Sequence, residues 1–234
     1  PSSSKPLNYR LQGGLIMEFY KDWNFWLAIF TAGTALFAIF QTQRQIKLSN
    51  KQQLFDSRME AWEKINGLLQ LMGDRSNQFS SEKDIPLELT IPFIDFTNNA
   101  YLSECLEIIG HELENPMHSN FLLKMEELRV LALKIRFLFS GKAATLCSNY
   151  VFEYQVLLRE MYKYNILMRD VDKNAQQYKL EYPDPRKYFA QRLGEPQRRK
   201  ELEEEYDKLK GIYELIKQEE VVSKIEKQIS LRKF

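Results

Sequence analysis

The stretch Trp23 to Phe40, WNFWLAIFTAGTALFAIF, decides the architecture that the sequence predicts. It contains no charged side chain, and Asn24 is its only strongly polar residue. A helix of this length rises about 27 Å, close to the roughly 30 Å of hydrocarbon in a bilayer. The segment is therefore long enough and apolar enough to span a membrane as one helix.

Two alternatives to a membrane span remain open for this stretch. A buried core helix is one, because the run lies at the lower edge of the spanning range. A cleaved signal peptide is the other, since such peptides carry a short apolar run near the N-terminus. However, the run ends in Phe37-Ala38-Ile39-Phe40-Gln41, with bulky residues where a cleavage site needs small ones. The sequence favours an uncleaved anchor.

The flanks of the span predict its orientation. Trp23 and Trp26 lie at its start, where amphipathic rings sit at the headgroup level of a bilayer. Four cationic residues follow its end, which predicts a cytoplasmic C-terminal side at the inner (cell) membrane: Arg44, Lys47, Lys51 and Arg58. Two cysteines, too few for a disulfide framework, suit the same reducing side.

The residues before the span are not expected to take part in the fold. Residues 1–16, PSSSKPLNYRLQGGLI, are rich in Ser, Pro and Gly, and Met17 follows them. We expect 1–16 to be a leader or a vector remnant, and 17–22 to be a short outer flank.

After the span, residues 41–72 predict a continuation of the same helix as a stalk that becomes the first cytoplasmic helix. Leu48, Phe55 and Trp62 recur every seven residues in this segment. Within the span, small residues share one helix face and could let two copies approach closely. The set that could support self-association is Ala28, Ala32, Ala35, Leu48, Phe55 and Trp62; the competing interpretation is a monomer that packs Phe55 and Trp62 against its own domain.

Composition favours an all-α protein. Of 234 residues, 44% are hydrophobic, and only nine are Gly and eight Pro, which disfavours turn-dense β folds. The formal net charge of +1 gives no field that would attract nucleic acid. Residues 73–234 are expected to form a helical cytoplasmic domain, with a loop at 73–84, a short helix near 91–96 and another from Asn98 to Gly110.

The longest helices are predicted in the second half of the chain. A helix capped by Ser119 should run to Phe139, before a left-handed Gly141, and form the buried centre of the domain. A final helix is expected over about 197–231, preceded by a connection with one short helical turn. Between them lies the cleanest 3.5-residue repeat, which predicts a long packed helix: Ala143, Cys147, Tyr150, Tyr154, Leu157, Met161, Tyr164, Met168 and Val171.

A search for catalytic or metal-binding patterns yields no strong candidate. His111 and His118 lie near several glutamates, but the H-E-x-x-H spacing fails because position 115 is Asn. Cys147 lies on the apolar stripe, and no phosphate-binding glycine loop occurs. The tyrosines of the repeat are interpreted as bundle packing, with hydroxyls at the edge. We expect no enzyme, no cofactor, no metal and no small-molecule substrate.

The order of features resembles single-span bacterial membrane proteins with a helical cytoplasmic domain, a family without a characterised activity. The likeness rests on LSNKQQLFDSRMEAWEKINGLLQLM (48–72), TNNAYLSECLEII (97–109) and KIRFLFSGKAATL (134–146). It implies a membrane-anchored module that docks a cytoplasmic partner or a second copy at the inner membrane. Because some proteins of this layout accompany anti-phage or stress loci, the alternative is an effector that perturbs the bilayer when it clusters.

Overall fold

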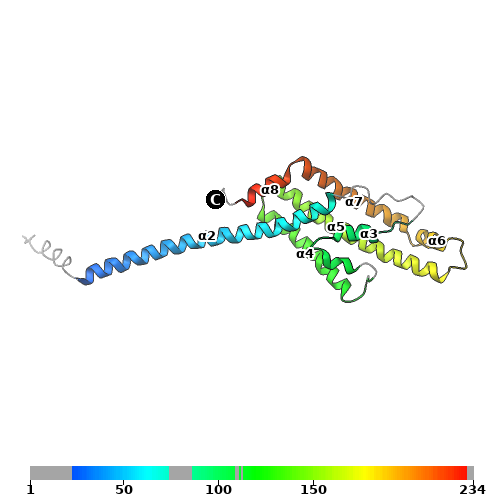
Figure 1. Ribbon diagram of the computed structural model, residues 1–234, viewed down its shortest axis with the longest axis horizontal. Coiled ribbons are helices and arrows are strands. Elements are labelled where there is room, and N and C mark those ends of the chain that lie inside the picture. The colour runs from blue at the N-terminus through cyan, green and yellow to red at the C-terminus, as the bar shows by residue number, and fades with distance from the viewer. Residues whose placement is uncertain (1–22, 74–85, 109–110, 112, 231–234) are drawn as a thin grey trace, which may run out of the picture. The chain divides into compact units, whose positions relative to one another are not determined.

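The computed structural model describes residues 23–73, 86–108, 111 and 113–230, and all regular structure within these ranges is helical. This confirms the all-α class. The elements, drawn in Figure 1, are α2 (Trp23–Gly73), α3 (Thr90–Thr97), the short 3₁₀ helix η1 (Ser103–Ile108), α4 (Met117–Leu138), α5 (Gly141–Gln177), α6 (Pro185–Arg192), α7 (Glu195–Gln218) and α8 (Val221–Ile229).

The chain divides into two units, residues 1–53 and 54–234. Helix α2 contributes its first part to the first unit and its last part to the second, which we call the helical domain. The predicted loop at 73–84 falls outside the described residues, apart from Gly73 at the end of α2.

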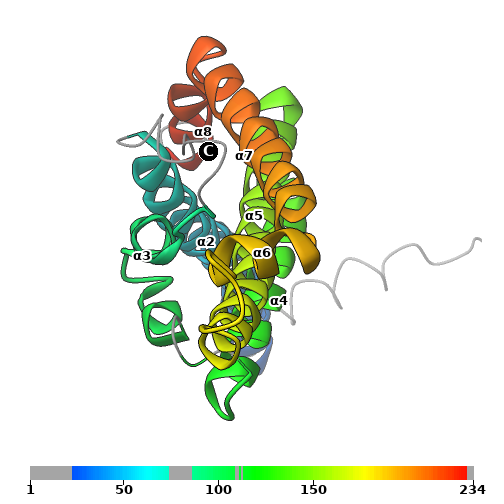
Figure 2. The ribbon, with the colours of Figure 1, turned by 90° about the vertical axis from the view of Figure 1, so that its right-hand side faces the viewer.

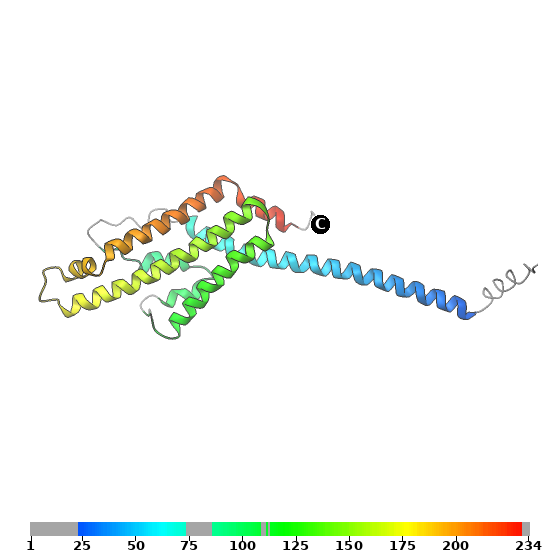
Figure 3. The same cartoon turned by 180° about the vertical axis from the view of Figure 1, so that it is seen from behind.

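Helix α5 is the centre of the helical domain. It contacts α3, α4, α6, α7 and α8, and it lies between α4 and α7 in Figures 2 and 3. Every residue of the predicted 3.5-residue repeat is buried in α5. The prediction of a long, packed helix at this place in the chain is therefore confirmed.

Three tyrosines of that repeat form hydrogen bonds between α5 and other elements. The Tyr150 hydroxyl donates to the Leu68 carbonyl of α2 over 2.9 Å, and the Tyr154 hydroxyl donates to the Phe96 carbonyl of α3 over 2.7 Å. The Tyr164 oxygen accepts from the Leu87 backbone N–H over 2.9 Å. The expectation that these hydroxyls reach the edge of the bundle was wrong, because they satisfy backbone groups inside the core.

The prediction that α4 is the buried centre was also wrong. One side of α4 packs on α5, but the other exposes several large apolar side chains. Its length and apolarity alone did not distinguish a helix packed on all sides from one packed on a single side.

Several helix boundaries differ from the predictions. The helix expected from Asn98 to Gly110 is represented by η1 alone among the described residues, and α4 begins two residues before Ser119, whose hydroxyl bonds the Asn115 side chain. The predicted last helix is two helices, α7 and α8, separated at Glu220, where φ is +50°. Gly141 has the expected left-handed φ of +74°, but it begins α5.

Candidate functional site

The first part of α2 exposes large apolar side chains around its whole circumference. Trp23 is 77% exposed and Phe30 is 71% exposed, and the most apolar 18-residue window of the helix has no buried residue. Leaving one such side chain in water rather than burying it costs about 1.5–3 kcal/mol. The segment is long and apolar enough to cross a membrane, which is where this surface would be covered.

Two threonine hydroxyls of this segment are satisfied within the helix. The Thr31 hydroxyl donates to the Leu27 carbonyl over 2.7 Å, and the Thr34 hydroxyl donates to the Thr31 carbonyl over 2.9 Å. Such bonds matter in hydrocarbon, where no water replaces a missing partner. The two threonines are therefore compatible with a lipid environment.

The residues assigned to possible self-association occupy different environments. Ala28, Ala32 and Ala35 are exposed, and their spacing places them on one helix face. Leu48 is also exposed, whereas Phe55 is half-buried against the core and Trp62 is 7% exposed. Phe55 and Trp62 thus contribute to packing of the helical domain itself, and the four exposed residues are the ones that a second copy could reach.

A second apolar surface, which the sequence analysis missed, lies on α4. Its side chains fall within an arc of about 100° on a helical wheel, and Phe137 is 87% exposed. A helical wheel would have revealed it, because Arg129 and Arg136 border one side of this arc. One charged residue, Glu126, lies within the arc and pairs with Arg129 over 4.0 Å. We call this surface the α4 stripe; it consists of Leu122, Leu123, Val130, Leu133 and Phe137.

The groups considered for catalysis or metal binding lie apart from one another. His111 Nδ1 lies 3.2 Å from Glu114 Oε2 on the surface, and His118 Nδ1 lies 2.7 Å from the Tyr162 hydroxyl. Within the described residues, no three His, Cys, Asp or Glu side chains are placed to hold a metal ion. Cys105 and Cys147 are buried, and burial raises the pKa of both thiols to about 12, so they stay protonated at neutral pH.

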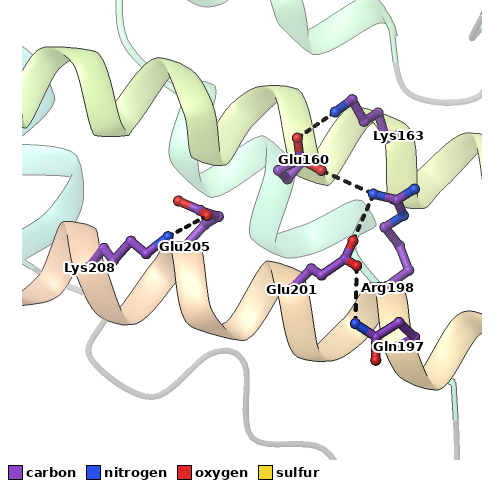
Figure 4. Close-up of polar contacts among 7 residues, drawn as sticks. All are labelled: Glu160, Lys163, Gln197, Arg198, Glu201, Glu205 and Lys208. Carbon is purple, nitrogen blue, oxygen red and sulfur yellow. Dashed lines mark hydrogen bonds and ion pairs between the residues drawn. The ribbon is translucent and has the colours of Figure 1, made fainter.

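Opposite charges alternate on the surface where α5 and α7 meet, as Figure 4 shows. Arg198 of α7 contacts Glu160 of α5 over 3.5 Å and Glu201 over 2.8 Å, while Lys163 donates to the same Glu160. Glu205 accepts from Lys208 over 2.7 Å. The charge-dense stretch 198–210 of α7 thus forms ion pairs at the surface of the helical domain, and surface pairs of this kind contribute about 0–1 kcal/mol each.

One arginine of the same stretch departs from that pattern. Arg199 is 9% exposed and donates to Glu195, which is 1% exposed and also accepts from the Tyr164 hydroxyl. Burial, followed by the bond to Glu195, raises the pKa of Tyr164. The three side chains form a polar cluster that is held together by hydrogen bonds. In the sequence, the i, i+4 spacing of Glu195 and Arg199 is the feature that could have predicted this ion pair.

Comparison with known proteins gave no family model, no curated protein and no solved structure that matches this chain.

Proposed function

We propose that the chain is a membrane-anchored helical interaction module, which holds a cytoplasmic partner or a second copy of itself at the inner membrane. The observation that carries this proposal is the fully exposed apolar segment of α2, which begins the same helix that ends in the core of the helical domain. Cationic residues after the span, beginning with Arg44, support a cytoplasmic domain.

The α4 stripe supports docking by the helical domain. Exposed apolar patches that are bordered by charges mark surfaces for protein contact. Phe137 and Leu133 offer the anchoring side chains, and Arg136 beside them offers a charge for orientation.

Orientation is tested with a C-terminal fusion to a phosphatase that is active only outside the cytoplasm. The fusion should be silent, and a matched fusion to a fluorescent protein that folds in the cytoplasm should be bright. An active phosphatase fusion would contradict the proposed orientation.

Docking is tested with a photo-crosslinking amino acid at Phe137 in living cells, and with the same group at exposed Lys179 as the control. We expect a product specific to position 137 that is lost when Leu133→Lys is added. A product of twice the chain mass identifies a second copy, and another defined mass identifies a partner. No specific product would contradict docking through α4.

The alternative is a membrane-perturbing effector that acts when spans cluster. The exposed face of Ala28, Ala32 and Ala35 favours it, because small residues allow close helix approach in lipid. Ala32→Leu should weaken cross-linking between spans, whereas Leu27→Ile should not. Dye leakage from vesicles that is abolished by Ala32→Leu would favour the effector; association without leakage would favour the docking module.

A further inference from the structure

A cavity of about 490 Å³ lies in the helical domain, at the start of α5 and beside α8. Four cationic side chains line it, from three different helices: Arg58 of α2, Lys142 of α5, and Lys224 and Lys227 of α8. No carboxylate is among its lining residues. Like charges gathered in one cavity repel each other unless an anion is bound between them.

Hydrogen bonds fix the walls of this cavity. Arg58 donates to the Leu138 carbonyl at the end of α4 and to the Gln228 carbonyl of α8, over 2.7 Å in both cases. The Gln228 side chain accepts from the Ser140 backbone N–H over 2.8 Å and donates back to the Ser140 carbonyl over 3.2 Å. The cavity is thus shaped by contacts that join α2, α8 and the α4–α5 connection.

The lysines are less constrained than the walls. Lys142 contacts Glu219 over 2.7 Å and Lys224 contacts the same carboxylate over 3.6 Å, while both side chains are more than half exposed. Lys227 has no ion pair among the described residues. Glu219 therefore pairs with two of the three lysines, and the excess charge is positive.

We propose that this cavity binds a phosphate-bearing anion, either the headgroup of an anionic phospholipid or a soluble phosphate compound. Lysine ammonium groups form strong, charge-assisted hydrogen bonds with phosphate oxygens. The backbone N–H groups at the start of α5, which have no side-chain cap, add positive potential at one wall. The cavity has room for an anion larger than phosphate alone. The site belongs to the helical domain and does not depend on the proposed docking function.

The test measures how fast each lysine of the full chain is acylated, by mass spectrometry. Inorganic pyrophosphate, added to the protein in neutral detergent, is the soluble probe; nanodiscs of phosphatidylcholine with or without phosphatidylglycerol are the lipid probe. Binding should slow acylation of Lys142, Lys224 and Lys227 about tenfold, while exposed Lys179 is unchanged. If pyrophosphate slows acylation of these lysines, the ligand is a soluble phosphate compound. If only phosphatidylglycerol slows it, the ligand is a lipid headgroup.

Charge removal provides the matched test. Lys227→Gln removes an exposed cation without breaking an ion pair, so the fold should be retained, and the affinity for the probe that protects the lysines should fall about tenfold. Lys179→Gln should leave it unchanged, and circular dichroism checks the helix content of both. The proposal is overturned if neither probe slows acylation, if Lys179 slows equally, or if the two variants bind alike.

Discussion

Helix α5 and the first part of α2 are both long apolar helices, yet they occupy opposite environments. Nine residues of α5 follow a 3.5-residue repeat, and the structure buries all nine inside the helical domain. The apolar residues of 23–40 follow no repeat, and the structure leaves them exposed on every side. A periodic apolar stripe thus predicts that a helix packs against other helices along one face. Apolarity around the whole circumference predicts that the helix lies in an apolar medium such as lipid.

The largest expected difference between the two regions concerns domain stability. Leu157→Ala in α5 should lower the free energy of unfolding by about 2–5 kcal/mol, because it leaves a cavity at a fully buried position. Glu203→Ala on α7 is the control and should change it by less than about 0.5 kcal/mol. Denaturant unfolding of the full chain in detergent measures both, and equal losses would show that the buried face of the domain has been misassigned.

A smaller loss of stability is expected when the polar cluster of Tyr164, Glu195 and Arg199, which joins α5 to α7, is disrupted. Tyr164→Phe removes the hydroxyl that donates to Glu195 and accepts from the Leu87 N–H, leaving buried groups without a partner. The free energy of unfolding should fall by about 1–3 kcal/mol. Half-buried Tyr178→Phe is the matched control. If both variants unfold at the same denaturant concentration, the cluster does not stabilise the fold.

The smallest expected effect is a gain in the free energy of unfolding. Burial, followed by the nearby Glu205 carboxylate, raises the pKa of Glu153, so its charged form disfavours folding at neutral pH. Glu153→Gln should therefore stabilise the domain by less than about 0.5 kcal/mol at pH 7. The gain should vanish as the pH falls below the ordinary glutamate value and the wild-type side chain is protonated. Glu203→Gln is the control, and a gain that is independent of pH would contradict this electrostatic cause.

The sequence predicted those parts of the fold in which one signal dominated. The α5 repeat was sufficient because its apolar residues recur at a regular spacing that keeps them on one face of a long helix. Helix α4 lacked this contrast, so its exposed Phe137 and Leu133 were placed in the core. The break between α7 and α8 had a signal, a shift of apolar phase between Ile216 and Val222, but a phase shift alone does not distinguish a break from a bend.

The candidate sites were harder to predict than the helices. The alanine face and the apolar segment are continuous in sequence and could be recognised directly. The cationic cavity combines Arg58 with Lys142, Lys224 and Lys227, which come from three helices far apart in the chain. Only the packing of those helices brings the charges together, so no local pattern could reveal it.

The central claim is that 23–40 needs lipid while the helical domain needs water. The most direct test is alkaline carbonate extraction of membranes that contain the full chain, beside a Leu36→Lys/Phe37→Lys variant. Charged residues in the middle of a span disfavour insertion by about 2.5–3.5 kcal/mol each, so the wild-type chain should stay in the membrane pellet and the variant should be extracted, with the same melting temperature of its domain. Extraction of the wild-type chain, or retention of both, would contradict the claim.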